Sequence, residues 1–562
     1  MSGFHQSPPV LANQYRDDAL LQSYLRSAAP AGVLAVIEPE LDSLGERAAG
    51  EWLALAEQAE AEPPRLVSYD AWGNRIDRIE TSDAWRAFER IAAAEGFVAC
   101  GYERAHGAFS RVDQFARLYL FAPSSAAYSC PLAMSDGAAR CLELMSSDDR
   151  QRAAFRHLTS RDPAQFWTAG QWMTERTGGS DVSGTSTVAK RDGPHFRLFG
   201  TKWFTSATTS QMALTLARPE GAEDGSRGLS LFYIELRDDA GLPRAMRVLR
   251  LKDKLGTRAL PTAEIELDGT PARMVGGDGH GVRKIATVLT ITRLYNALAA
   301  LAGMRRAIAL ARDYARRRTA FGRPLSEHPL HVETLAAMQV ELAGCFLLVF
   351  RAIELLGLTE LGMATERDER VLRLLTPVAK LYTGKRAVAT ASEAIEAFGG
   401  AGYIEDTGLP RLLRDAQVLS IWEGTTNVLS LDVWRAIDAE PQTIDALCDE
   451  VHAHLDAAAT GDLAGSAARV RDAARALAET ARRLAGEEAA DRETAARQFA
   501  FAIARVTAGA LLIAHAHRCR STPLGVRLAD AARRWASSEL LPPLDTGDDY
   551  RAASRRLGLD TN

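Results

Sequence analysis

Apolar residues recur at helical spacing over two long parts of this chain, and a different pattern separates them. From about residue 18 to 165, segments such as SLGERAAGEWLALAEQAEAE at 43–62 place Ala and Leu on one helical face. One interruption at 66–80 is polar and contains Gly73-Asn74, which indicates a short hairpin. We therefore expect a helical N-terminal domain over residues 1–167, with a hairpin insert.

Between residues 168 and 278 the pattern is that of short strands. Runs that bear Thr, Val and aromatic residues, for example LSLFYIELR at 229–237, alternate with Gly, Asp and Pro turns. The turns recur roughly every 8–12 residues, which is typical of a small antiparallel barrel or sandwich. We expect a middle β-barrel domain here.

Long helical patterns return after residue 280. They cover 284–318, 330–358, 366–398 and a run from about 426. Helices of this length stack most easily as an antiparallel bundle, so we expect a four-helix bundle over 279–440. The remaining Ala-rich chain predicts an extra helical domain over 441–562. The predicted fold class is mostly α with a central antiparallel β-barrel and a C-terminal helical extension.

Composition excludes some functions. Hydrophobic residues make up 47% and charged residues 25% of the 562 residues, as in ordinary globular proteins. The formal net charge of −5 gives no overall attraction to nucleic acid or to an anionic membrane. The six cysteines lie far apart, without a C-x-x-C pair or a nearby His cluster, so we expect reduced thiols and no metal site.

The N-terminus and the apolar runs bear on location. The first residues lack a basic segment followed by an apolar core, so we expect no secretory signal. The most apolar run, LAGCFLLVF at 342–350, is too short by itself to span a bilayer. We expect a cytoplasmic protein with no membrane partner.

The segment SIWEGTTN at 420–427 places one carboxylate, Glu423, between an aromatic residue and a glycine, just before a helical run. Such an acid is a candidate for proton abstraction. The alternative is an acid beside a helix N-terminus, where negative charge is favoured and Thr425 or Thr426 would cap.

Four further segments carry candidate chemistry, each with a structural alternative. Gly178-Gly179 could hold polar cofactor atoms on its backbone, or could form an ordinary turn. Trp203-Phe204 could stack on a flat ring, or could belong to the core. Arg316–Arg318 could clamp a diphosphate, or could only favour a helix C-terminus. Gly399-Gly400 could approach a ligand or subunit closely, or could end a helix.

Taken in this order, these five segments resemble the acyl-CoA dehydrogenase family, most strongly from about 165 to 440. A narrower likeness to its AidB branch rests on YDAWGNRID at 69–77, LKDKLGTR at 251–258 and SIWEGTTNVLSLDVWR at 420–435. The resemblance implies a helical domain, a β-barrel and a four-helix bundle. It also implies a flavoprotein with FAD between barrel and bundle and contacts from a second subunit.

The resemblance implies site residues by position. The residues implied to bind FAD are Met173, Thr174, Ser180, Trp203, Thr205, Arg318, Phe321, Gly399, Gly400, Thr425 and Asn427. Of these, Arg318 and Phe321 would reach the FAD of a neighbouring subunit. Ser180, Arg293 and Gly424 would bind the substrate, and Glu423 would be the catalytic base.

The implied reaction is α,β-dehydrogenation of an acyl-CoA thioester. Some family members place the base on the first bundle helix, but residues 284–312 contain no Asp or Glu, and Thr292 stands at that place. Glu423 is therefore the base that the motifs support. The implied partners are acyl-CoA, an electron-transferring flavoprotein and further copies of the chain in a homotetramer.

Two other functions remain open at this point. AidB-like proteins are associated with duplex DNA binding, but residues 441–562 hold 16 Arg and no Lys against 17 acidic residues. Within them, 505–534 carries six Arg (Arg505, Arg518, Arg520, Arg527, Arg533 and Arg534) against Asp530 alone. Such a cluster could grip DNA phosphates, or could be a solvated face or a subunit contact. The chain could also bind acyl-CoA with little turnover.

Overall fold

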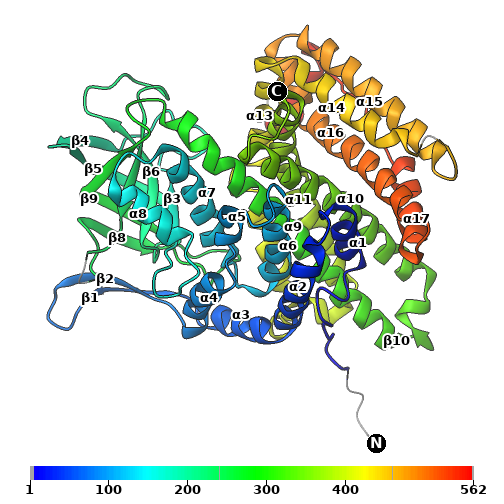
Figure 1. Cartoon of the computed structure of the whole chain (residues 1–562), viewed down its shortest axis with the longest axis horizontal. Coiled ribbons are helices and arrows are strands. Elements are labelled where there is room, and N and C mark those ends of the chain that lie inside the picture. The colour runs from blue at the N-terminus through cyan, green and yellow to red at the C-terminus, as the bar shows by residue number, and fades with distance from the viewer. Residues whose placement is uncertain (1–5, 239–240, 459, 560–562) are drawn as a thin grey trace, which may run out of the picture. The chain divides into compact units, whose positions relative to one another are not determined.

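The computed structural model describes residues 6–238, 241–458 and 460–559 (Figure 1). The chain divides into two compact units. The bundle unit comprises the described residues of 1–42, 106–112 and 300–562, and the barrel unit comprises those of 43–105 and 113–299. Each unit has its own clusters of buried apolar residues.

The N-terminal part of the chain is helical apart from one hairpin, as the sequence predicts. At the hairpin tip, the Asp70 carboxylate accepts from the backbone N–H groups of Trp72 and Asn74 at 2.8 and 2.9 Å, which fixes the turn. The elements are α1 (Ala19–Ala28), α2 (Val33–Ala49), α3 (Glu51–Ala61), β1 (Arg65–Tyr69), β2 (Arg75–Glu80), α4 (Asp83–Ala94), α5 (Ala99–Glu103), α6 (Phe109–Phe121), α7 (Ser129–Met145) and α8 (Asp149–Leu158).

The middle of the chain forms a closed barrel of five strands. Two of these strands each pair with one further strand outside the ring. The strands are β3 (Ala169–Trp172), β4 (Val188–Asp192), β5 (His195–Ser206), β6 (Met212–Pro219), β7 (Ser230–Glu235), β8 (Met246–Leu251) and β9 (Thr262–Val275). The ring runs β6-β4-β5-β9-β7 and returns to β6, while β3 pairs with β6 and β8 with β9. The predicted fold class is confirmed, although β6 pairs in parallel with both β3 and β4.

The barrel contains a buried ion pair. Lys202 on β5 is 0% exposed, and its ammonium lies 2.8 Å from the Glu175 carboxylate and donates to the Leu216 carbonyl at 2.8 Å. Glu175 also accepts from the backbone and hydroxyl of Ser186, at 2.7 and 2.6 Å. Burial opposes ionisation of Glu175, but Lys202 and these donors outweigh it and lower its pKa to about 2.

The bundle unit contains the long helices. Its α12 was not predicted from the sequence, and α9 contributes residues to both units. The helices are α9 (Gly281–Arg317), α10 (Pro329–Glu360), α11 (Glu366–Glu396), α12 (Leu409–Leu419), α13 (Thr426–Ala439), α14 (Gln442–Asp456), α15 (Ala464–Ala485), α16 (Ala489–Arg518), α17 (Pro523–Ser537) and α18 (Asp548–Leu559).

The C-terminal helices pack directly on the bundle. Figure 1 shows α16 beside α10 and α11, and α16 contacts both of them as well as α13. Arg351 on α10 donates to Glu450 on α14 at 2.9 Å and to Glu354 at 3.0 Å. Burial opposes ionisation of Glu450, but the nearby His454 and the bonded Arg351 lower its pKa to about 2. A buried charged network thus joins the predicted bundle to the predicted extension.

Three helices are long and apolar enough, by length and composition alone, to cross a membrane. They are α9, α10 and α16, and 67%, 78% and 89% of their apolar windows are buried within the protein. The run at 342–350 therefore belongs to a 32-residue helix rather than to a short one.

Lys202→Met tests the buried pair of the barrel unit. Removing one partner leaves the Glu175 charge in the core without its counter-ion, so we expect a loss of about 3 kcal/mol in the free energy of unfolding at pH 7. The folded-state pKa of Glu175 is lowered, so the pair stabilises fully above pH 4.5 and less as pH falls toward 2. As the pH falls from 4.5 to 2, the free energy of unfolding should therefore decrease less in the variant than in wild type.

Urea denaturation across this pH range, followed by tryptophan fluorescence, measures both effects. Lys190→Met is the matched control, because Lys190 is exposed on the neighbouring strand β4. Equal stability of the Lys202 and Lys190 variants would contradict the assigned role of the pair.

Glu450→Gln tests the join between α14 and the bundle. We expect a cost of about 2 kcal/mol, because Arg351 loses a charged partner in a buried setting. Asp445→Asn on the same helix breaks an exposed pair with Arg482, whose side chains are 53% and 64% exposed, and should cost about 0.5 kcal/mol or less. Hydrogen exchange of α14 and α16 should rise only in the Glu450 variant, and similar exchange in both variants would refute the prediction.

Candidate functional site

In the barrel unit, the segment after β3 forms a glycine-rich loop. Met173 and Thr174 are half-buried, whereas Ser180 is exposed. Gly178 has a φ of +128°, and a Cβ atom on Gly179 would lie 2.4 Å from the Thr174 hydroxyl oxygen. Both positions therefore require glycine, and the loop presents backbone and hydroxyl groups close together. Glu175, which belongs to this loop, is buried and bonded to Lys202, and it anchors the loop.

Trp203 is tied to the same loop. Its backbone N–H donates to the Thr174 carbonyl at 2.9 Å. The Lys252 ammonium lies 3.6 Å from the centroid of the indole ring and also 2.5 Å from the Glu264 carboxylate. The Arg176 guanidinium is 5.4 Å from the same ring. Trp203 is thus held in place by this backbone hydrogen bond to the loop and by cation–π contacts on its indole.

The other expected residues of the barrel unit differ in their surroundings. Phe204 is 54% exposed, so the aromatic pair does not belong to the core. Thr205 is buried and its hydroxyl donates to the Ala263 carbonyl at 2.8 Å, which leaves its oxygen as an acceptor. Arg293 is half-buried on α9, beside the fully buried Thr292, whose hydroxyl donates to the Val288 carbonyl at 3.1 Å.

In the bundle unit, Arg318 and Phe321 lie in a turn after α9. This turn pairs β10 (Thr319–Ala320) with β11 (Arg323–Pro324). Phe321 occupies the tip with a φ of +48° and is 96% exposed. Arg318 is half-buried and donates to the Gln6 side chain at 3.3 Å.

The glycine segment at 399–403 lies in the same part of the bundle unit. Tyr314 on α9 contacts Phe398 with ring centroids 4.7 Å apart, so one apolar cluster supports both segments. Gly399 and Gly400 are exposed, and a Cβ atom on either would meet open space. A Cβ atom on Gly402 would lie 1.9 Å from the Ile395 carbonyl, so Gly402 serves the packing of the turn on α11.

Glu423 occupies a tight turn between α12 and α13. It is half-buried with a φ of +64°, and Gly424 follows with a φ of +108°. A left-handed non-glycine residue costs about 1–2 kcal/mol, so the surrounding structure must hold it. Thr425 caps α13 by accepting from the Val428 backbone at 3.5 Å, and Asn427 is exposed in the first turn. The cap thus falls two residues after Glu423.

Within the bundle unit, these groups flank α12 along the chain. Gly399 and Gly400 precede this helix, and Glu423 follows it. The helix has 11 residues, and at about 1.5 Å per residue it spans about 16 Å. The predicted cofactor glycines and the predicted base are therefore separated by a short helix, on one continuous segment.

Two lysines that contact the expected site residues were not predicted as site residues from the sequence. Lys252 contacts Trp203, and Lys380 donates to the Gly424 carbonyl at 2.5 Å. Composition was the only hint, since seven of the 67 cationic residues are lysines, but it does not distinguish these two from the exposed Lys190.

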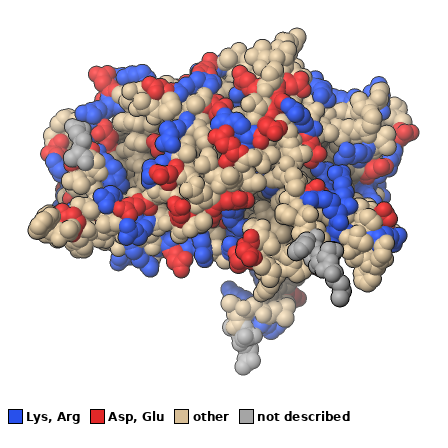
Figure 2. Space-filling view, turned by 90° about the horizontal axis from the view of Figure 1, so that it is seen from below, with Lys and Arg blue, Asp and Glu red and all other residues tan. Residues whose placement is uncertain are grey.

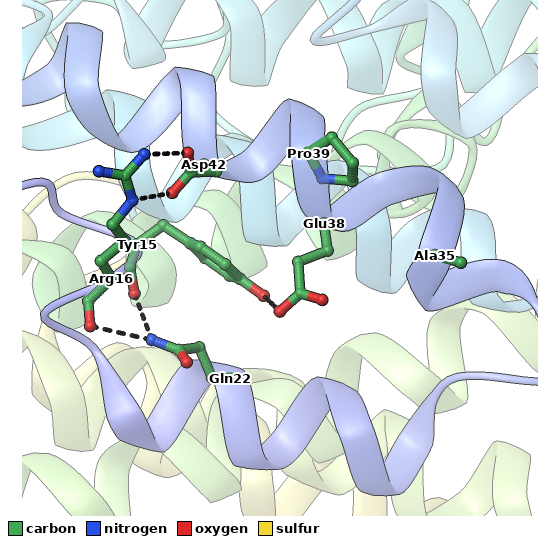
Figure 3. A pocket seen from close by; sticks show the side chains of 7 residues that line it. All are labelled: Tyr15, Arg16, Gln22, Ala35, Glu38, Pro39 and Asp42. Atoms are coloured by element: carbon green, nitrogen blue, oxygen red, sulfur yellow. Dashed lines mark hydrogen bonds and ion pairs between the residues drawn. The ribbon is translucent and has the colours of Figure 1, made fainter.

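Two surface hollows formed by described residues contain none of the expected site residues. One of about 400 Å³ lies between α1 and α2, where Tyr15 donates to Glu38 at 2.9 Å and Arg16 makes two bonds to Asp42 (Figure 3). Burial and the Glu38 carboxylate raise the pKa of Tyr15 above its usual range. Gln22 donates to the carbonyls of Tyr15 and Arg16 at 2.8 and 3.0 Å. These polar groups bind one another, so the hollow is a structural junction.

Charge is mixed rather than gathered by sign on the face of the molecule drawn in Figure 2. Figure 2 shows basic and acidic side chains interspersed over the visible face. In the C-terminal arginine cluster, Arg533 pairs with Asp530 at 2.9 Å and Arg534 with Glu333 at 2.8 Å. Arg505 donates to Ser538 at 2.7 Å. The cluster is therefore partly neutralised, and this arrangement does not favour DNA binding.

Comparison with protein families covers most of the chain. Residues 170–270 match the acyl-CoA dehydrogenase middle domain, and residues 279–437 match the C-terminal domain of the same family. Residues 6–162 match the N-terminal domain of the adaptive response protein AidB. Residues 442–560 match the C-terminal-domain-like family of acyl-CoA dehydrogenase 11.

Individual proteins similar to this chain belong to the same family. The chain is 46% identical over 530 residues to acyl-CoA dehydrogenase family member 11 of Caenorhabditis elegans, covering 92% of this chain and 86% of that protein. It is 34% identical over 420 residues to AidB of Escherichia coli (strain K12), covering 73% of this chain and 76% of that protein. The crystal structure of Caenorhabditis elegans ACDH-11 in complex with C11-CoA matches with a TM-score of 0.97 and 43% identity, covering 100% and 97% of the two chains. The resemblance inferred from the motifs is confirmed: the chain belongs to the acyl-CoA dehydrogenase family, in its AidB-like branch.

Proposed function

We propose that this protein is an FAD-dependent acyl-CoA dehydrogenase in which Glu423 removes the α-proton of an acyl-CoA thioester. The observation that carries the proposal is the conformation at Glu423. This carboxylate stands in a left-handed turn immediately before a capped helix, and backbone strain of this kind is retained where a side chain must be presented in one direction.

The residues present fit a flavin cofactor. Trp203 offers a half-buried indole, and its backbone is bonded to the Thr174 carbonyl. Gly399 and Gly400 leave their backbone open to a ligand, since no atom lies where their Cβ atoms would stand. The family supplies a precedent, because an acyl-CoA dehydrogenase from Bacillus anthracis was solved complexed with FAD and shares the fold at a TM-score of 0.70.

Each group of residues has an assigned part in binding. Met173, Thr174, Ser180, Trp203 and Thr205 would hold FAD from the barrel unit. Arg318, Phe321, Gly399, Gly400, Thr425 and Asn427 would hold it from the bundle unit, with Arg318 and Phe321 acting on a neighbouring subunit. Arg293 and Gly424 would join Ser180 in binding the thioester. The homotetramer and the electron-transferring flavoprotein partner stay predictions.

The chemistry assigned to this chain is a proton transfer. Glu423 takes the proton from the α-carbon, and the C–H electrons form the new α,β double bond as a hydride leaves the β-carbon. Bound FAD would accept that hydride. The backbone of the Glu423–Gly424 turn would lie beside the thioester carbonyl, where N–H donors stabilise developing negative charge. Thr292, which stands where some relatives carry the base, is a neutral hydroxyl with its proton engaged by Val288.

Binding of acyl-CoA has a direct precedent in a close relative. ACDH-11 of Caenorhabditis elegans, 43% identical to this chain, was solved with C11-CoA. We therefore propose that a medium-to-long acyl chain is the natural test substrate.

Glu423→Gln tests the proposed base. The amide keeps the shape of the side chain but does not take up a proton, so the variant should retain FAD and bind acyl-CoA while anaerobic flavin reduction falls by at least about 10³-fold. Stopped-flow absorbance at saturating acyl-CoA measures the rate of reduction, and a static titration measures binding.

Glu393→Gln serves as the control, because Glu393 is exposed on α11 in the same unit and its loss should leave reduction unchanged. A wild-type rate of reduction in the Glu423 variant would exclude Glu423 as the base.

A further inference from the structure

Lys380 is buried in the middle of α11, with a side chain that is 0% exposed. Lysine is almost never fully buried unless its ammonium is bound, because removing the charge from water is costly. Its ammonium donates to the Gly424 carbonyl at 2.5 Å. One acceptor is thus the carbonyl of the peptide that joins Gly424 to Thr425, one residue beyond Glu423.

The bond acts on a backbone that needs support. Glu423 has a φ of +64°, a conformation that a non-glycine residue does not keep without restraint, and Gly424 follows it with a φ of +108°. A hydrogen bond from a charged donor is shorter and stronger than a neutral one, and its strength increases away from water. Lys380 therefore restrains Gly424, and through Gly424 the direction in which the Glu423 side chain leaves the turn.

A second residue on the same face of α11 contacts the same segment. Gly384 is four residues after Lys380, so both lie on one side of the helix. A Cβ atom on Gly384 would lie 2.7 Å from the Leu419 carbonyl and 3.3 Å from the Ser420 Cα. The absence of a side chain at 384 lets the end of α12 approach α11, and Lys380 then reaches the turn beyond it.

The other side of the turn is closed by packing. A Cβ atom on Gly424 would lie 2.9 Å from a Leu429 methyl group on α13, so only glycine fits there. The backbone N–H groups of Ile421 and Trp422 both donate to the Val418 carbonyl, at 2.9 and 2.8 Å. The segment from 418 to 424 is therefore restrained from α11, α12 and α13.

We propose that Lys380 is a positioning residue for the reaction: its buried ammonium holds the Gly424 carbonyl and so fixes the direction of the Glu423 carboxylate. This inference rests on the proposed role of Glu423. A compact ammonium suits this closed position, whereas the planar, forked guanidinium found at 60 of the 67 cationic positions would not be equivalent.

A residue that positions the base can be distinguished by experiment from a residue that only stabilises the fold. If Lys380 only supports the fold, its loss should weaken FAD retention, acyl-CoA binding and turnover together. If it positions the base, its loss should lower the rate of proton abstraction while binding stays intact, because small displacements of a reacting group have large effects on rate.

The test uses the FAD-loaded Lys380→Met protein, with Lys385→Met as the matched control on the same helix. Lys385 is half-buried and lies on another face of α11. The maximal rate of anaerobic flavin reduction by a medium-chain acyl-CoA should fall about 10²-fold in Lys380→Met. Its Kd for the same acyl-CoA should stay within about twofold of wild type, because the change removes no contact that holds the bound substrate. Hydrogen exchange of residues 418–425 should be faster in this variant alone.

Gly384→Ala provides a second route, including the case in which Lys380→Met fails to fold. The added methyl group displaces the Leu419 carbonyl, so we expect the same selective loss of maximal rate. A wild-type rate in either folded variant, or parallel losses of rate and acyl-CoA affinity, would overturn the positioning role. If Glu423→Gln reduces flavin normally, the proposed base itself is wrong; if Glu423→Gln is inactive and Lys380→Met is normal, only the role of Lys380 is wrong.

Discussion

The left-handed turn at Glu423 and Gly424 is the constraint on which the candidate chemistry depends. The left-handed backbone conformation of Glu423 is unfavourable for a non-glycine residue, so it persists only where neighbouring elements hold it. The neighbours supply a bond from Lys380, a glycine at 384 that permits close approach, and a helix that is capped at Thr425. The long helices of the bundle unit thus give a rigid setting to one short loop.

Buried charges have a similar part in both units. In the barrel unit, the ion pair of Glu175 and Lys202 anchors the loop that carries Met173 and Thr174. In the bundle unit, Arg351 and Glu450 connect α10 to α14. Such pairs add little net stability compared with apolar packing, but a misplaced partner leaves an uncompensated charge, which penalises alternative arrangements. We infer that they fix geometry at the places where loops and added helices meet the core.

Much of the fold follows from pattern in the sequence. The hairpin at 65–80, the short strands and the long helices were predicted because period and turn residues differ sharply between these segments. The parallel pairing of β6 with β3 and β4 was not predicted. Side chains alternate with period two in both parallel and antiparallel strands, so the pattern does not show the direction of pairing. Helix α12 was missed because its 11 residues lie between glycine-rich segments that resemble a loop.

The candidate site was only partly predictable. Glu423, Trp203 and the glycine segments stand out in the sequence because their neighbours are unusual. Lys252 and Lys380 do not, since each acts across a large sequence separation: 44 residues part Lys380 from the Gly424 carbonyl. A contact of this kind depends on how α11 packs on the segment after α12, which no local pattern records.

The central claim is that Glu423 removes an α-proton as flavin is reduced. The most direct measurement is anaerobic stopped-flow reduction of the FAD-loaded wild-type protein by a medium-chain acyl-CoA and by its α,α-dideuterated form. The account predicts loss of the oxidised flavin absorbance, and slower loss with the deuterated compound because the α C–H bond is broken in that step. Saturating binding of acyl-CoA with no loss of flavin absorbance would contradict it.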